Sequence, residues 1–144
     1  MRSSSDEQYV LDLCDEVLGE KGSRQHRFSW LLGDPSPKTG RSVPLPVDCY
    51  WPTFDLVVEF HERQHTESVA FFDKPDKLTV SGVHRGEQRA IYDERRRRLV
   101  PEHGLSLVIV TLAEFDHRRG KIVRQPHRDL DLIAQRLGDA AAPR

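Results

Sequence analysis

Hydrophobic positions along the chain follow different periods in different segments, and each period predicts a different element of structure. Over residues 6–18 the apolar side chains recur at helical spacing, which indicates a helix with one buried side. Residues 127–138 repeat that spacing, so a second amphipathic helix is expected near the end of the chain. Its inward-facing residues are expected to be Leu130, Ile133, Ala134 and Leu137.

Apolar runs of strand length lie between these helices. Residues 53–62 are predicted to form the central strand, and the continuous β-branched run over residues 105–115 indicates a second buried strand. Pro44 and Pro46 indicate an edge position or a late start for a strand over residues 42–51, because each proline lacks a ladder donor. Other segments are expected to be a strand over 26–33, a turn over 34–42, and a helix from 85 to about 100 that Pro101 disturbs and Gly104 stops.

The predicted order is helix, strand, strand, strand, helix, strand, helix, which places the chain in the α/β class. At 144 residues it is expected to form a single domain. Residues 1–5 and 139–144 are expected to fray at the ends. Residues 66–84 show no clean period, so they are interpreted as an inserted loop.

Two acids fall inside the predicted strands at positions where burial is costly. Asp48 lies in one strand, and Glu59 lies eleven residues later in the next, with His61 two positions on. If these strands pair antiparallel, Asp48 and Glu59 come within reach of one shared cation. Two carboxylates plus water are a ligand set that suits Mg²⁺. The alternative is a sheet that simply carries polar residues at its ends.

The first predicted helix carries two acids whose positions relative to its apolar stripe differ. Glu7 lies close to the apolar stripe of residues 6–18, whereas Glu16 lies roughly opposite and is expected to be solvated. Glu7 is therefore the better inward-facing carboxylate. Its alternative role is that of a first-turn acid favoured by the helix dipole.

The ordered set of these motifs resembles the PD-(D/E)XK nuclease superfamily, and most closely its small proteins related to very-short-patch mismatch-repair endonucleases. The resemblance covers roughly residues 7–116, and its motifs are Val47-Asp48, Leu56-Val57-Val58-Glu59, Gln64-His65, Asp93, Arg96, Gly104 and the run LSLVIV. It implies a restriction-endonuclease-like core, α-β-β-β-α-β-α, with a central mixed sheet flanked by helices. It further implies Mg²⁺- or Mn²⁺-dependent hydrolysis of phosphodiester bonds in DNA, in a repair or defence system.

The resemblance also assigns roles to individual residues. Asp48 and Glu59 would hold the metal, with Glu7 as the third carboxylate, and His61 would orient or deprotonate the attacking water. His61 occupies the position where the superfamily has lysine. Histidine can act as a base or as a cation near neutral pH, but it is a different reagent from lysine. The alternative is therefore a catalytically inactive nuclease-fold protein that binds nucleic acid or a protein partner.

Contacts to nucleic acid are expected from four other residues. Arg96 either forms an i,i+3 surface pair with Asp93 or binds a phosphate through its planar fork. Arg95 is a further candidate for contact with the nucleic acid. Gln64 and His65 are interpreted as ligands of phosphate or water, and a zinc site built from His61 and His65 is disfavoured because His61 is at a strand end and no cysteine is near.

Composition limits the partners of the chain. A net charge of −1 argues against strong sequence-independent DNA binding, yet residues 1–20 are acidic and residues 95–98 are all arginine. Arg118, Arg119, Lys121 and Arg124 form a second basic cluster. Cys14 and Cys49 are expected to be reduced, half-buried apolar residues. No membrane span or secretion signal is recognisable, so a cytoplasmic protein is expected. The resemblance implies DNA as the partner. Homodimerisation or a protein partner is left open.

Overall fold

The computed structural model of the chain describes residues 4–62 and 85–141. The chain divides into two compact units, and each is described by itself. The first unit comprises Met1–His26, Val47–Arg63 and Gly104–Arg144, and the second comprises Arg27–Pro46 and Gln64–His103. The loop expected over residues 66–84 lies outside the described residues, as do the last three residues of the chain.

Helix α1 (Asp6–Leu18) has the bounds that its hydrophobic period predicts. The Ser5 side chain caps its first turn by accepting a hydrogen bond from the backbone N–H of Gln8 (3.1 Å). Gly19 ends the helix in the left-handed conformation (φ 70°), which glycine adopts without steric cost. The buried face of α1 consists of Val10, Leu11, Leu13, Cys14 and Leu18.

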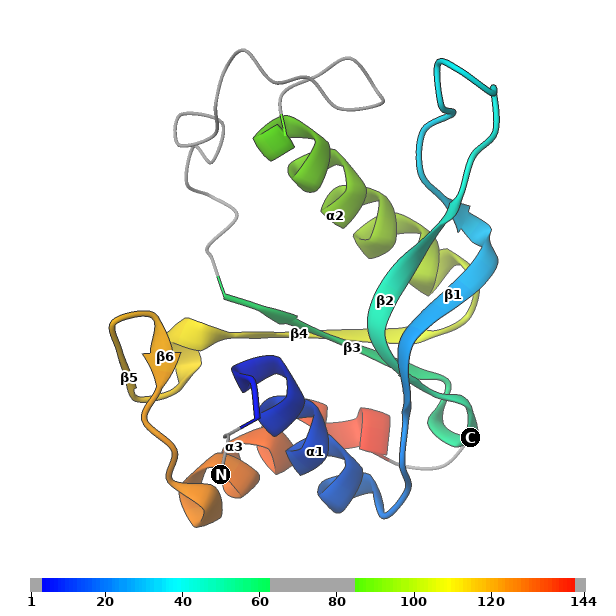
Figure 1. Ribbon diagram of the computed structural model, residues 1–144. Helices are drawn as coiled ribbons and strands as arrows, with labels where there is room; N and C mark the ends of the chain where they lie inside the picture. Colours follow the sequence, from blue (N-terminus) through cyan, green and yellow to red (C-terminus); the bar gives the residue numbers. More distant parts are fainter. Residues whose placement is uncertain (1–3, 63–84, 142–144) are drawn as a thin grey trace. The chain divides into compact units, whose positions relative to one another are not determined.

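The central sheet has four strands in the order β1-β2-β3-β4 (Figure 1), namely β1 (Ser23–Leu32), β2 (Pro44–Trp51), β3 (Leu56–His61) and β4 (Ser106–Thr111). Strand β3 pairs antiparallel with β2 and parallel with β4, so the sheet is mixed. The four strands of this sheet and the helices follow one another along the chain in the predicted order. The α/β class expected from the sequence is therefore confirmed.

Strand β3 is buried on both faces, which explains its near-continuous apolar sequence. A single 3-10 turn over Pro52–Phe54 connects it to β2. Asp55 then takes a left-handed conformation (φ 47°), and its carbonyl accepts a hydrogen bond from the N–H of Ser106 (2.8 Å). This bond ties the start of β3 to the start of its parallel neighbour β4.

Helix α3 (Pro126–Leu137) packs against α1, and both contact the sheet within the first unit (Figure 1). The expected inward position of Ala134 is wrong, because Ala134 is exposed. Asp129 is buried instead (2% exposed), where it accepts hydrogen bonds from the hydroxyl of Tyr9 (2.5 Å) and from the backbone N–H of Gln125 (2.9 Å). The inward stripe therefore runs through Asp129, Ile133 and Leu137, each four residues after the last.

The apolar run of residues 105–115 is only partly strand. Strand β4 ends at Thr111, where a capping box with Glu114 starts a 3-10 turn over Leu112–Glu114. Strands β5 (His117–Arg118) and β6 (Lys121–Ile122) follow as a separate two-stranded hairpin. This hairpin was not predicted from the sequence.

The second unit consists of α2 (Arg85–Glu102) and the chain of residues 27–46. The hydroxyl of Tyr92 accepts a hydrogen bond from the N–H of Asp34 (2.9 Å), and Arg95 donates to the carbonyl of Leu32 (2.8 Å). Pro101 lies inside the last turn, so the helix ends slightly beyond the expected residue 100. A proline at this place removes one terminal hydrogen bond without breaking the preceding turns.

Candidate functional site: an acid cluster in the first unit

Asp48 and Glu59 lie at the end of the antiparallel ladder between β2 and β3. The register pairs Trp51 with Leu56 and Cys49 with Val58. Continued by one residue, it would place Asp48 opposite Glu59, as the sequence predicts. The two acids thus come from adjacent strands at the same level of the sheet.

Each carboxylate accepts a backbone hydrogen bond from the other's strand. Glu59 Oε2 accepts from the N–H of Asp48 (2.6 Å), and Asp48 Oδ2 accepts from the N–H of Phe60 (2.7 Å). These crossed bonds fix both side chains at the end of the ladder. They also engage one oxygen of each carboxylate.

Burial and neighbouring charge both oppose ionisation of the Asp48 carboxyl. Burial raises the pKa of Asp48 to about 7, and repulsion from the Glu59 carboxylate adds to the shift. The hydrogen bond from Phe60 and the nearby His61 act in the opposite direction but do not cancel it. Negative charge is therefore costly at this position when no cation is bound.

Glu7 on α1 belongs to the same cluster. Burial raises its pKa, and repulsion from Glu59 raises it further. Gln25 in β1, whose backbone has a positive φ of 50°, donates a hydrogen bond to Glu7 Oε2 (3.2 Å). We refer to Asp48, Glu59 and Glu7 as the acid cluster.

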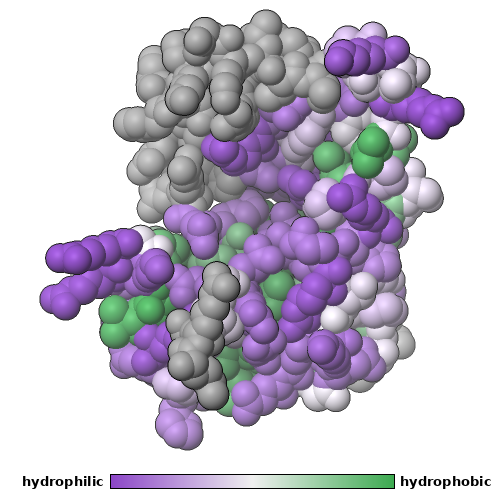
Figure 2. Space-filling model, in the orientation of Figure 1, coloured by the Kyte–Doolittle hydropathy of each residue, from purple (hydrophilic) through white to green (hydrophobic). Residues whose placement is uncertain are grey.

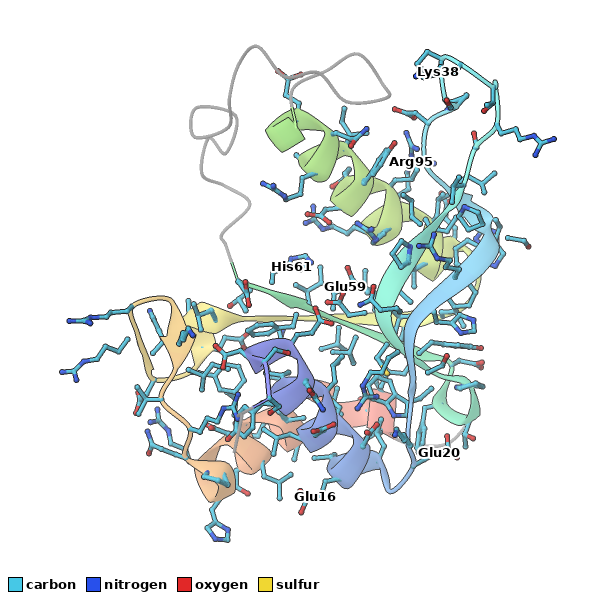
Figure 3. All side chains as sticks on the ribbon, in the orientation of Figure 1. Glu16, Glu20, Lys38, Glu59, His61 and Arg95 are labelled. Carbon is cyan, nitrogen blue, oxygen red and sulfur yellow. The ribbon has the colours of Figure 1, made fainter. Side chains whose placement is uncertain are left out.

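Two further residues near the acid cluster in sequence or in space, Glu16 and His61, are labelled in Figure 3. Glu16 is exposed on α1 and points away from Glu59, as its position on the helical wheel predicts. His61 lies next to Glu59 on β3, with Nε2 at 3.7 Å from Glu59 Oε1. When protonated, its ring can therefore attract the Glu59 carboxylate electrostatically, and when neutral it can accept a proton beside the carboxylates.

The acid cluster offers the type of ligand atom that hard divalent cations prefer. All three side chains offer carboxylate oxygens, and they come from three different elements, α1, β2 and β3. The crossed amide bonds hold Asp48 and Glu59 before any ion binds. A cation at this position would remove the repulsion that raises the pKa of Asp48 and Glu7.

Comparisons with models of protein families, with curated proteins and with solved structures found no match to this chain. The case for a function therefore rests on the chemistry of the acid cluster. In the part of the chain that the structure describes, no helix is long and apolar enough to cross a membrane.

Of the four predicted nucleic-acid ligands, the structure describes Arg95 and Arg96, both on α2. Arg96 lies in the second unit, where it donates to the carbonyl of Pro46 (3.0 Å) and to Asp93 Oδ1 (2.9 Å). Arg95 donates to Leu32 and to Asp34 Oδ1 (2.9 Å) in the same unit. Gln64 and His65 lie outside the described residues. The i,i+3 pair that was one of two alternatives for Arg96 is thus present.

Sequence reasoning missed a second charged cluster in the first unit. Arg24 forms a two-point ion pair with Asp15 (2.6 and 3.2 Å) and donates to Cys49 Sγ (3.0 Å). The N–H groups of Gly22 (2.8 Å) and of the Trp51 indole (3.1 Å) also donate to Asp15. Cys49 is free and fully buried, as is Cys14, so both are more buried than expected. We refer to Asp15 and Arg24 with these donors as the paired cluster.

Proposed function

We propose that this protein is a metal-dependent endonuclease that hydrolyses phosphodiester bonds in DNA. The observation that carries the proposal is the acid cluster, in which Asp48 and Glu59 are held by crossed backbone bonds while Glu7 approaches from α1. Buried acids that repel one another are costly for a structural role alone. They are typical of sites that take up a cation during function.

Asp48 and Glu59 would hold the divalent cation, Mg²⁺ or Mn²⁺, and Glu7 would complete the ligand set. When bound, such a cation lowers the pKa of water and stabilises negative charge on phosphoryl oxygens. The protein's own contribution is to position the ligands. Asp48 is oriented by the N–H of Phe60, Glu59 by the N–H of Asp48, and Glu7 by the side chain of Gln25.

His61 is the candidate for moving a proton at the acid cluster. Its Nε2 lies beside Glu59 Oε1, so its ring is within the reach of a water that binds among the carboxylates. Neutral imidazole accepts a proton from such a water, and the adjacent Glu59 carboxylate stabilises the imidazolium that results. In this role His61 would stand in for the lysine that the resemblance to the nuclease superfamily implies at this position.

The order of elements supports the proposal that the core is restriction-endonuclease-like. Apart from the β5–β6 hairpin, a helix is followed by three strands, a helix, a strand and a helix, and the proposed metal ligands lie on α1, β2 and β3. The mixed sheet β1-β2-β3-β4 is compatible with that topology. Among the motifs of the resemblance, Asp48 lies on β2, Glu59 on β3, and Asp93 and Arg96 on α2, which supports this proposal.

A second candidate is a catalytically inactive relative that binds nucleic acid or a protein partner. The crossed amide bonds favour it, because they give Asp48 and Glu59 a purely structural task at the end of the β2–β3 ladder. His61 in place of lysine favours it as well. The two candidates differ in whether the carboxylates are needed for turnover.

A cleavage assay separates the two candidates. Wild type is incubated with single-stranded, duplex and mismatched DNA in Mg²⁺ or Mn²⁺, beside Asp48→Asn and the control Glu16→Gln. Asp48→Asn is expected to lose more than about a hundredfold in rate, since even groups that only support a metal ligand change affinity or activity by about 10–100-fold. Glu16→Gln is expected to match wild type because Glu16 is exposed. Absence of wild-type cleavage on all substrates with both metals would favour the inactive relative.

A further inference from the structure

A two-residue turn connects strands β5 and β6. His117 pairs with Ile122 and Arg118 with Lys121, so Arg119 and Gly120 are the two turn residues. Both have positive φ, 55° and 77°, which is the pattern of the type I′ turn. Asparagine, aspartate and glycine favour the first position of this turn, and arginine does not. The chain therefore keeps an arginine where the backbone disfavours it.

The base of the hairpin is firmly attached to α1. Ile122 is buried and its N–H donates to Asp6 Oδ2 (2.9 Å). Arg124 donates to Ser4 Oγ (3.2 Å), and its guanidinium lies over the ring of Tyr9 at 4.5 Å. These contacts leave the tip, rather than the base, as the part exposed to solvent.

The tip of the hairpin, residues 118–121, carries cations that the other described residues do not neutralise. Arg118, Arg119 and Lys121 are exposed, and none of them is in an ion pair with any residue in 4–62 or 85–141. Arg118 and Lys121 are direct cross-strand partners, so two like charges face each other, an arrangement that destabilises a hairpin. Figure 2 shows hydrophilic side chains projecting into solvent at the place of this hairpin.

The hairpin borders a cavity that also reaches the end of β3. The cavity has a volume of about 470 Å³ and is lined by residues 4–6, residues 120–122, Arg124 and Glu62. Glu62 directly follows His61, beside the acid cluster. Basic tip, cavity and strand end thus lie in the same unit of the structure.

We propose that the hairpin β5–β6 is a nucleic-acid-binding element, in which Arg118, Arg119 and Lys121 contact backbone phosphates of a strand that passes the end of β3. The inference rests on the proposed function in one respect, that the bound strand is the substrate of the acid cluster. A polyanion would relieve the repulsion between Arg118 and Lys121, because phosphates neutralise the facing cations, and it would give the exposed Arg119 a partner.

A nucleic acid fits better than another anionic partner for two reasons. Three cations follow one another within four residues, which matches the closely spaced phosphates of a strand. The acid cluster repels any phosphate that approaches it, so a DNA-cleaving site of this kind needs a basic rim that offsets the repulsion. No other exposed cation pair of the first unit faces across a strand pair in this way within the described residues.

The decisive variant is Arg119→Asn, which separates folding from binding. Asparagine followed by Gly120 is the preferred type I′ turn, so the variant is expected to raise the melting temperature. It also removes one cation, so affinity for a fluorescent duplex is expected to fall. A residue with a purely structural role would not lose affinity while gaining stability.

A double variant and a matched control measure the number of phosphate contacts. Arg118→Gln with Lys121→Gln is compared with Arg97→Gln with Arg98→Gln, which removes the same charge from exposed positions of α2. Binding is measured without divalent metal over a range of salt concentrations. The hairpin variant is expected to lower the slope of log affinity against log salt by about 1.8, or about 0.9 per contact, and to weaken binding about tenfold or more. The control is expected to keep most of the slope.

The outcomes distinguish this inference from the proposed function. If wild type cleaves DNA and the hairpin variants bind as wild type does, the hairpin inference is overturned and the nuclease proposal stands. If no substrate is cleaved but the hairpin variants lose affinity, the nuclease proposal fails and the binding element stands. Equal losses in the hairpin and α2 variants, or binding to phosphatidylserine vesicles in preference to DNA, would overturn the hairpin inference.

Discussion

Helix α1 contributes one half-buried acid to each of two clusters, and the two acids behave in opposite ways. Burial opposes the ionisation of Asp15, but hydrogen bonds from Arg24 and the N–H of Gly22, with the charge of Arg24, hold its pKa below the usual value. Burial and the charge of Glu59 raise the pKa of Glu7. The same helix therefore carries a stabilised carboxylate at one end and a destabilised one at the other.

The difference lies in the partners that each cluster provides. The paired cluster surrounds Asp15 with a guanidinium, a backbone N–H and the indole N–H of Trp51. The acid cluster gives Asp48 and Glu59 one backbone N–H each and adds a third carboxylate, Glu7. The two clusters therefore differ in the balance of charge around the helix acid: Asp15 faces a guanidinium, whereas Glu7 faces the Glu59 carboxylate. A raised carboxyl pKa of this kind supports the proposed cation site.

The largest expected effect is a contrast between two isosteric substitutions. Asp15→Asn removes the charge that pairs with Arg24, so the free energy of unfolding is expected to fall by about 2–3 kcal/mol. Asp48→Asn keeps an oxygen for the N–H of Phe60 and removes the repulsion from Glu59, so it is expected to leave stability unchanged or higher at pH 8. Urea unfolding of both variants without metal measures the contrast. Equal destabilisation would show that the acid cluster is compensated like the paired cluster.

Metal binding is expected to separate the acid cluster from the paired cluster, with a smaller effect on stability than the substitution Asp15→Asn. Mg²⁺ or Mn²⁺ at tenfold above its dissociation constant should stabilise wild type by about 1.4 kcal/mol through linkage. The increment should be smaller at pH 5 than at pH 8, because the Asp48 carboxyl, with a pKa of about 7, is protonated at the lower pH. Asp48→Asn should lose most of the increment, whereas Asp15→Asn should keep it. Melting temperatures measured with metal and with a chelator test this expectation. An unchanged increment in Asp48→Asn would place the ion elsewhere.

Each of the two clusters should make the free energy of unfolding depend on pH, but over a different pH range. The pKa of Asp48 is raised from 3.8 to about 7, so the folded state binds its proton more tightly, and stability is expected to fall as pH rises from about 4 to 7. The pKa of Asp15 is lowered, so its contribution is present above about pH 4 and is lost as pH falls further. Each slope is limited to about 1.4 kcal/mol per pH unit for one proton.

Metal-free unfolding curves across pH test this division. Asp48→Asn should flatten the slope between about pH 4 and 7, and Asp15→Asn should flatten the slope below about pH 4. Subtracting the wild-type curve removes the contribution of the other titrating groups. A change in the same pH range for both variants would contradict the assignment.

Local patterns were enough to predict the elements that carry the acid cluster. The helical period and Gly19 define α1, and the alternation along β3 places Glu59 and His61 on one side. The antiparallel pairing of β2 and β3 then brings Asp48 to Glu59. All of these depend on residues close in sequence or on one short connection. The convergence of Glu7 also follows from its place on the helical wheel.

Contacts between distant segments could not be predicted in the same way. Asp129 is buried because Tyr9, 120 residues earlier, donates to it, and that contact rotates the inward face of α3 away from Ala134. The ion pair between Arg24 and Asp15 depends on the path of the chain between the end of α1 and the start of β1. The β5–β6 hairpin was missed because its strands have two residues each and its turn begins with arginine instead of a favoured turn residue.

The smallest expected effect distinguishes two glutamates on α1. Glu7→Gln removes one of the charges that raise the pKa of Asp48, so the midpoint of the Asp48 titration should move to lower pH. Its effect on stability should remain within about 0.5 kcal/mol, because relief of repulsion is opposed by loss of an acid from the first turn of the helix. Glu16→Gln is the matched control, since Glu16 is exposed and points away from Glu59. Carboxyl-carbon NMR titration measures both midpoints. If the two variants leave the Asp48 midpoint at the wild-type pH, Glu7 is not part of the acid cluster, and the proposed metal site is reduced to Asp48 and Glu59.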